Sequence, residues 1–196
     1  MEATDKSLID AHCKGNLTAF TELVRRYGGI VLGYLKQLCG NQEQAEDFFQ
    51  ETFRRVHEKA HTFKGTQLKP WLLTISTHVA INGLRKNKRL KLVSLYRQTD
   101  CPDGDCDESE AIAILDNSRN PLDEAANTEQ KNLVRQAINF LPARQRATLI
   151  LAYYQQMSYP EVAAALGCSV GTVKTQMYRA LRTLAQKLPE FGGEIK

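Results

Sequence analysis

The sequence predicts an all-α protein: two helical domains joined by an acidic flexible linker, with a helix-turn-helix in the C-terminal domain. Three observations support this prediction. Apolar residues recur at the helical spacings i, i+3, i+4 and i+7 in both halves of the chain. No stretch alternates apolar and polar residues between hairpin turns, as strands would. The charge also changes sign twice along the 196 residues.

The charge pattern indicates where the domains lie. Residues 1–98 carry 16 Lys and Arg against 9 Asp and Glu, whereas residues 99–130 carry one Arg against 10 acidic residues. Residues 131–196 are basic again, with 9 against 3. Such an acidic stretch cannot bury a core and indicates a linker, while basic bodies favour binding to a polyanion. We therefore expect three segments: residues 1–90, the linker 91–127 and residues 128–196.

The composition excludes several classes of protein. Apolar residues make up 42% and charged residues 24% of the chain, which is typical of a soluble folded protein. The longest apolar run, residues 147–154, is too short to cross a bilayer, and the acidic start of the chain argues against a secretory signal. Five irregularly placed cysteines argue against a disulfide framework. We therefore expect a protein of the reducing cytoplasm.

The N-terminal part predicts four helices. Gly28 and Gly29 predict a break between the first two, and Gly40 predicts the end of the second. Pro70 is suited to the first turn of the fourth. The four helices are expected near residues 20–27, 31–38, 42–61 and 70–88.

The C-terminal part predicts a helix-turn-helix. Ser158 with Glu161 forms a capping-box pattern, Gly167 is a typical helix stop, and Ser169 is a good cap for the last helix. The expected helices are residues 128–140, 142–154, 159–166 and a last one from 170. Small, polar and basic side chains on the outer face of the last helix suit binding in a groove of DNA. This face comprises Gly171, Thr172, Lys174, Thr175, Gln176, Tyr178, Arg179 and Arg182. The alternative is a helical hairpin whose basic face is merely solvated.

The expected helix 42–61 has an unusual acidic face. Glu43, Asp47 and Glu51 follow at successive i+4 spacings, which destabilises an isolated helix. Such a face would suit docking onto a basic protein surface. The alternative is that nearby cations relieve the repulsion, and these are Arg54, Arg55 and Lys59.

The next helix carries a polar strip that runs into a basic tail. The aromatic residues Phe63 and Trp71 lie at its start. Aromatic rings beside a basic, amide-bearing helix suit the bases and backbone of an opened DNA strand. Alternatively Trp71 belongs to the core. The polar strip and the start of the tail are Thr74, Thr77, His78, Asn82, Arg85 and Lys86.

Other candidate sites are weak. Cys101 and Cys106 could form a metal or redox module, although zinc sites favour shorter spacings and more ligands. The pairs His12 with Cys13 and His57 with His61 lack evident partner ligands. Because no catalytic constellation stands out, we expect no enzyme, no cofactor and no metal site.

Four segments resemble, in order and spacing, the extracytoplasmic-function (ECF, group IV) RNA polymerase sigma factors of the sigma-70 family. Residues 44–53, QAEDFFQETF, are similar to the family's AEDLVQETF signature, and residues 70–82, PWLLTISTHVAIN, are similar to its WLLTIARNVAID segment. Residues 141–146 (LPARQR) and 158–174 (SYPEVAAALGCSVGTVK) resemble its last domain. The resemblance covers roughly residues 17–90 and 130–186.

The resemblance implies a role at promoters. The first domain would bind the clamp helices of core RNA polymerase and melt the −10 element, and the second would bind the −35 element. The implied polymerase contacts are Asp47, Gln50 and Glu51. The implied −10 contacts are Trp71, Thr74, Thr77, His78, Asn82, Arg85 and Lys86. The implied −35 contacts are Thr172, Lys174, Thr175, Tyr178, Arg179 and Arg182. The family further implies a sequestering anti-sigma factor, often membrane-embedded, that would hold this cytoplasmic protein at the inner membrane face.

The chain departs from the family pattern in the −10 segment. Residues 76–78 are Ser-Thr-His where the family has Ala-Arg-Asn, and Asn82 replaces the usual Asp. The −10 sequence preference therefore cannot be carried over. A rival interpretation is a stand-alone helix-turn-helix regulator that binds a palindrome without polymerase, its N-terminal helices dimerising or sensing a ligand.

Overall fold

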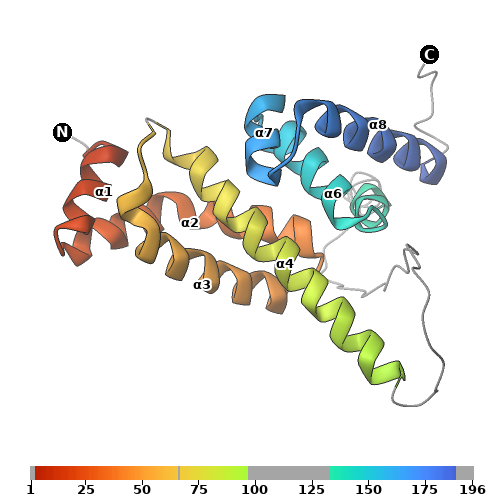
Figure 1. Cartoon of the computed structure of the whole chain (residues 1–196), viewed down its shortest axis with the longest axis horizontal. Helices are drawn as coiled ribbons and strands as arrows, with labels where there is room; N and C mark the ends of the chain where they lie inside the picture. Colours follow the sequence, from red (N-terminus) through yellow and green to blue (C-terminus); the bar gives the residue numbers. More distant parts are fainter. Residues whose placement is uncertain (1–2, 66, 97–132, 189–196) are drawn as a thin grey trace, which may run out of the picture.

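The computed structural model describes residues 3–65, 67–96 and 133–188. All regular secondary structure in these ranges is helical (Figure 1). The first body holds α1 (Asp5–Cys13), α2 (Leu17–Cys39), α3 (Gln42–Lys59), the short 3₁₀ helix η1 (Ala60–Thr62) and α4 (Leu68–Tyr96). The second holds a helical stretch at 133–139, α6 (Ala143–Leu149), the π-helix η2 (Ile150–Tyr154), α7 (Tyr159–Leu166) and α8 (Val170–Lys187). The all-α prediction is confirmed.

The predicted break at Gly28 and Gly29 is wrong, because α2 runs unbroken from Leu17 to Cys39. An apolar stripe along the whole helix is buried, so tertiary packing outweighs the helix cost of about 1 kcal/mol for each glycine. Gly28 lies in this packed face, and a Cβ added to it would lie 3.6 Å from the Phe49 ring. The helix α1, which the sequence analysis did not predict, begins with a side-chain cap from Thr4.

The helix α4 is longer than predicted and continues to Tyr96, well past residue 88. Its last turns therefore lie within the segment expected to be linker. In Figure 1 this C-terminal part of α4 projects away from the packed helices. The rest of the expected acidic linker, from residue 97, lies outside the described residues up to 132.

A buried hydrogen bond joins α2 to α4 at the centre of the first body. The Tyr34 and Thr77 side chains are fully buried and their hydroxyl oxygens lie 2.7 Å apart. Because Thr77 donates its proton to the Leu73 carbonyl at 2.6 Å, its oxygen accepts from the Tyr34 hydroxyl. Both polar groups are thereby satisfied inside an apolar core, as buried hydroxyls require.

The two bodies pack against each other. Helix α7 lies against α4, and α6 contacts the end of α2. Among the described residues two hydrogen bonds cross this junction: Lys69 Nζ donates to the Gln155 carbonyl at 3.1 Å, and Arg146 Nη1 donates to the Leu38 carbonyl at 2.9 Å. One apolar cluster includes residues of both bodies, among them Leu72 and Val162. The described domains therefore share a continuous core.

Gly83 on α4 provides a test of the α3–α4 packing. A Cβ at this position would overlap the ring of Phe48 on α3. We expect Gly83→Ala to lower the free energy of unfolding by about 1–3 kcal/mol, because the ring or the helix must move. Gly33→Ala is the matched control, since a Cβ there meets nothing within 4 Å, and it should raise stability by about 0.5–1 kcal/mol. Urea unfolding of both variants measures the difference, and equal effects would contradict this packing.

His12 forms a buried contact between α1 and the neighbouring helices. Its ring centroid lies 4.7 Å from that of Phe20 and 4.8 Å from that of His57, and the side chain is only 7% exposed. Among the described residues its Nδ1 atom has no hydrogen-bond partner. Burial, and secondarily the charge of His57, lowers the pKa of His12 below its ordinary value of 6.5.

This lowered pKa predicts acid sensitivity of the fold. Below about pH 6.5 the unfolded chain takes up a proton that folded His12 resists, so the free energy of unfolding should fall as the pH falls. We expect His12→Phe to reduce this dependence, measured by urea unfolding at pH 7.5 and 5.5. His61→Phe, at an exposed position, is the control. Equal pH dependence in wild type and His12→Phe would refute the assignment.

Candidate nucleic-acid and polymerase interfaces

The C-terminal helix-turn-helix is built as predicted. The Glu161 carboxylate accepts hydrogen bonds from the backbone N and Oγ of Ser158, at 2.8 and 2.6 Å. Gly167 ends α7 in the left-handed conformation, with φ of 62°. Ser169 Oγ then accepts from the backbone N of Thr172 at 3.1 Å and starts α8. These caps fix the angle between α7 and α8.

Helix α8 has one buried and one open face. Val173 and Ala180 are fully buried against the rest of the domain. The predicted −35 residues lie on the remaining surface, and Thr172 among them is half-buried by its position at the cap. The exposed members are Lys174, Thr175, Tyr178, Arg179 and Arg182. The structure thus brings three cations and two hydroxyl-bearing side chains together on one open helix face, which suits phosphate and base contacts.

Most of the predicted −10 strip also lies at the surface of α4. Trp71 is half-buried, with its ring 5.4 Å from that of Phe63, so it packs on the core and still presents one edge. Thr74 is half-buried and its hydroxyl donates to the Pro70 carbonyl at 2.8 Å. The exposed members of the strip are His78, Asn82, Arg85 and Lys86.

Thr77 requires a correction. The sequence pattern predicts Thr77 in the DNA-facing strip, but its side chain is fully buried and hydrogen-bonded to Tyr34. Successive residues of a helix point about 100° apart, so the rotation that buries Thr77 turns the next residue, His78, to the surface. In this structure Thr77 belongs to the core, and His78 is the residue that reaches the surface.

The structure adds basic residues that the sequence analysis did not assign to the −10 strip. The pKa of His78 is lowered, first by partial desolvation and then by the positive charges of Lys59 and Arg55 on α3. The two helices are therefore close enough for their charges to interact. A sequence signal was present, because Phe48, Arg55 and Lys59 recur at helical spacing along one side of α3.

The acidic face of α3 is only partly neutralised. Arg54 and Arg55 both donate to the Glu51 carboxylate, with Nε–O distances of 2.7 Å for each. The hydrogen bonds from Arg54, and to a smaller extent those from Arg55, lower the pKa of Glu51 to about 2. Asp47 is exposed and has no salt-bridge partner among the described residues. The alternative interpretation, that neighbouring cations relieve the repulsion between the acidic side chains, therefore holds for Glu51 and not for Asp47. Gln50 is exposed beside these two residues.

The structure tests only some of the weaker candidates. Within residues 3–65, 67–96 and 133–188, no group of three or more His, Cys, Asp or Glu is placed to hold a metal ion. The predicted Cys101–Cys106 module lies outside the described residues. No helix in the described part of the chain is both long and apolar enough to cross a membrane.

Comparison with known proteins gives the same two-part division. The family model described as "Sigma-70 region 2" matches residues 23–90, and "Sigma-70, region 4" matches residues 131–184. The ECF RNA polymerase sigma factor SigX of Bacillus subtilis is 32% identical over 177 residues, covering 90% of this chain and 87% of SigX. The chain belongs to the ECF RNA polymerase sigma factors. SigW of the same organism, also an ECF sigma factor, is 29% identical over 194 residues, covering 97% of this chain and all of SigW.

Solved structures agree with this ECF sigma factor assignment. The sigma factor RpoE of Bartonella quintana, solved with the anti-sigma factor NepR, has a TM-score of 0.65 and 26% identity over 88% of this chain and 98% of RpoE. CnrH, solved with the cytosolic domain of CnrY, has a TM-score of 0.62 and 23% identity over 96% of this chain and 99% of CnrH, and shows the shared fold.

Membership of this family settles the general function. This ECF sigma factor directs promoter-specific transcription, and its partners are core RNA polymerase and promoter DNA.

Proposed function

We propose that this chain is a group IV sigma factor in which residues 1–90 bind core polymerase and the −10 element and residues 128–196 bind the −35 element, with 91–127 as the linker. It acts by recruitment and strand opening and is not itself an enzyme. The observation that carries the proposal is the open basic face of α8 within a capped helix-turn-helix. Short polar groups such as Thr175 allow close approach to a groove floor, and Arg179 can reach base edges.

The first body offers two further surfaces of different chemistry. Asp47, Gln50 and Glu51 on α3 form an acidic and amide face that suits a basic surface of the polymerase clamp. The strip on α4, with half-buried Trp71 and Thr74 and exposed His78, Asn82, Arg85 and Lys86, suits a melted strand, because bases stack on aromatic rings and cations bind phosphates. The buried Thr77 is left out of this proposed surface.

We also propose that an anti-sigma factor regulates the chain. RpoE of Bartonella quintana and CnrH were both solved in complexes, with the anti-sigma factor NepR and with the cytosolic domain of CnrY respectively. A membrane-embedded partner would hold this cytoplasmic protein at the inner membrane face. Co-purification from cells before and after stress would identify such a partner.

Transcription with purified core polymerase distinguishes the proposed sigma factor from the rival interpretation, a stand-alone helix-turn-helix regulator. We expect start sites on a genomic promoter library only when both the chain and core polymerase are present. Gel shifts on the same promoters should show tight binding only with the holoenzyme, because each domain alone offers a small interface. A stand-alone regulator would instead bind a duplex palindrome tightly without polymerase.

Asp47→Lys should weaken binding to core polymerase. Asp47 is exposed and unneutralised, so charge reversal removes an attraction and adds a repulsion without disturbing the core. Asp10→Lys is the matched control, because Asp10 is an exposed acid on α1 and not on α3. Competition with labelled wild type for core polymerase measures the affinity. Equal affinity of the two variants would contradict the assignment of this face.

Arg179→Ala should reduce promoter binding by the holoenzyme. A bidentate base contact is worth about 1–3 kcal/mol, and a phosphate contact is worth less. Electrophoretic shifts on duplexes that differ at single −35 positions distinguish the two, since only a base contact relaxes specificity at one position. Arg135→Ala, an exposed arginine outside α8, is the control. No loss on any promoter would show that Arg179 does not face DNA.

A further inference from the structure

Helix α3 presents cations toward α4 as well as acids toward solvent. Phe48 on α3 packs directly against Gly83 of α4. Arg55 follows Phe48 by seven residues, which is two helical turns along the same side of α3, and Lys59 follows one turn later. Both cations therefore lie at the edge of α3 that borders α4.

The direction of the helices places these cations beside the proposed −10 strip. Helices α3 and α4 run in opposite directions (Figure 1). Arg55, two turns onward from Phe48 on α3, thus corresponds to a position two turns back from Gly83 on α4, which is Ser76, two residues before His78. The electrostatic effect of Arg55 and Lys59 on His78 agrees with this register.

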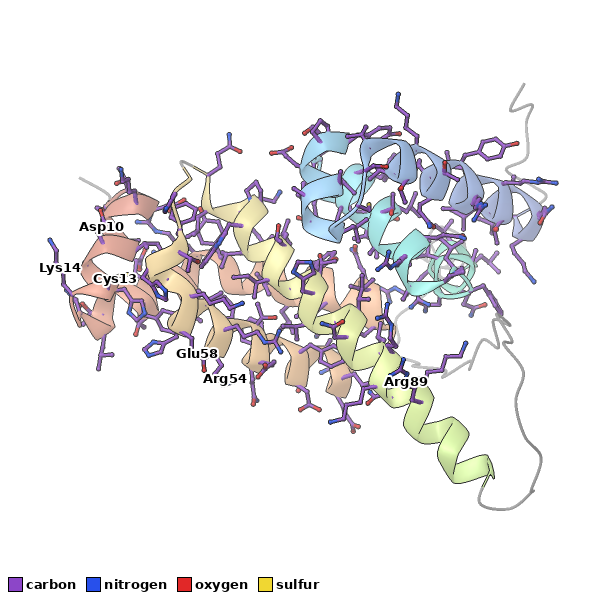
Figure 2. All side chains as sticks on the ribbon, viewed as in Figure 1. Asp10, Cys13, Lys14, Arg54, Glu58 and Arg89 are labelled. Carbon is purple, nitrogen blue, oxygen red and sulfur yellow. The ribbon has the colours of Figure 1, made fainter. Side chains whose placement is uncertain are left out.

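Arg55 is paired with Glu51 on its own helix. Its Nε donates to Glu51 Oε1 at 2.7 Å, and its side chain is 36% exposed. Arg54 donates to the same carboxylate, but it also pairs with Glu58. Figure 2 shows Arg54 and Glu58 together on the side of α3 that faces away from α4. Of the two arginines bonded to Glu51, only Arg55 therefore borders the strip on α4.

We propose that Arg55 is a further contact to the phosphate backbone of the melted −10 strand, and that Glu51 withholds it until polymerase engages the acidic face of α3. The inference rests on the proposed function of that face. A cationic polymerase surface would compete with Arg55 for the Glu51 carboxylate, because its two oxygens offer a limited number of acceptor sites and Arg54 already occupies some of them. Arg55 would then be free to turn its guanidinium to a phosphate, a pairing that its planar donors suit. Polymerase binding and strand binding are thereby coupled through one ion pair.

The test compares Arg55→Gln with Arg54→Gln. The probe is a labelled 20-nucleotide single strand carrying the −10 non-template sequence of a promoter mapped by transcription, bound to holoenzyme at saturating core polymerase. We expect Arg55→Gln to weaken binding roughly threefold to tenfold and to reduce the salt dependence by one contact, about 0.7 in the log–log slope. Arg54→Gln should leave the slope unchanged. Equal slopes of log affinity against log salt concentration for the two variants would overturn the proposal. The proposed function would still stand in that case if the wild-type holoenzyme carries out promoter-specific transcription.

The free chain tests the role of Glu51. We expect Glu51→Gln to raise the affinity of the free chain for the same strand, because Arg55 is released. The double variant Glu51→Gln/Arg55→Gln should lose that gain, and Glu51→Gln/Arg54→Gln should keep it. Thermal unfolding monitored by circular dichroism verifies that each variant is folded. A gain that survives removal of Arg55, or no gain at all, would show that Glu51 does not restrain this arginine.

Discussion

The hydrogen bond between the Tyr34 and Thr77 hydroxyls fixes the helix on which the rest of the structure depends. It orients α4 about its own axis, because Thr77 can reach Tyr34 in one rotation of the helix only. The same rotation buries Leu73 and Ala80 and turns His78 and Asn82 to the surface. A buried polar pair of this kind costs free energy if either partner is left unsatisfied, so it opposes rotation of α4 in addition to the apolar packing. The position of the proposed DNA-facing strip thus follows from a bond inside the core.

Helix α3 shows how one short helix serves two charged surfaces. Its acids lie with Arg54 on the side away from α4, whereas Arg55 and Lys59 border α4, and Glu51 accepts from both Arg54 and Arg55. Exposed ion pairs of this type contribute little to stability, since solvent screens them. These ion pairs instead determine which charged side chains are free to bind polymerase or DNA. Asp47, which has no such pair among the described residues, is available in the free chain, whereas Arg55 is not.

Sequence periodicity predicted the long helices well but could not give their lengths or rotations. The capping box at Ser158 and the stop at Gly167 are local signals, and both are confirmed. The continuity of α2 through Gly28 depends on tertiary packing against Phe49, which no local propensity encodes. Thr77 was placed on the wrong side of its helix because a threonine suits either a polar strip or a satisfied buried site. Only the position of Tyr34, 43 residues earlier in the chain, decides between them.

The packing of the two bodies leaves both proposed DNA surfaces exposed but constrains their separation. Helix α7 lies between α4 and α8, and packed helices are about 8–10 Å apart. With helices of these lengths, the centres of the α4 strip and of the α8 face lie no more than about 45 Å apart. Elements at −10 and −35 lie about 25 base pairs apart, or about 85 Å along B-DNA at 3.4 Å per pair. Under the proposed assignment, reading both elements therefore requires the junction at Lys69 and Arg146 to open. Among the described residues, the shared apolar core and two hydrogen bonds oppose that step.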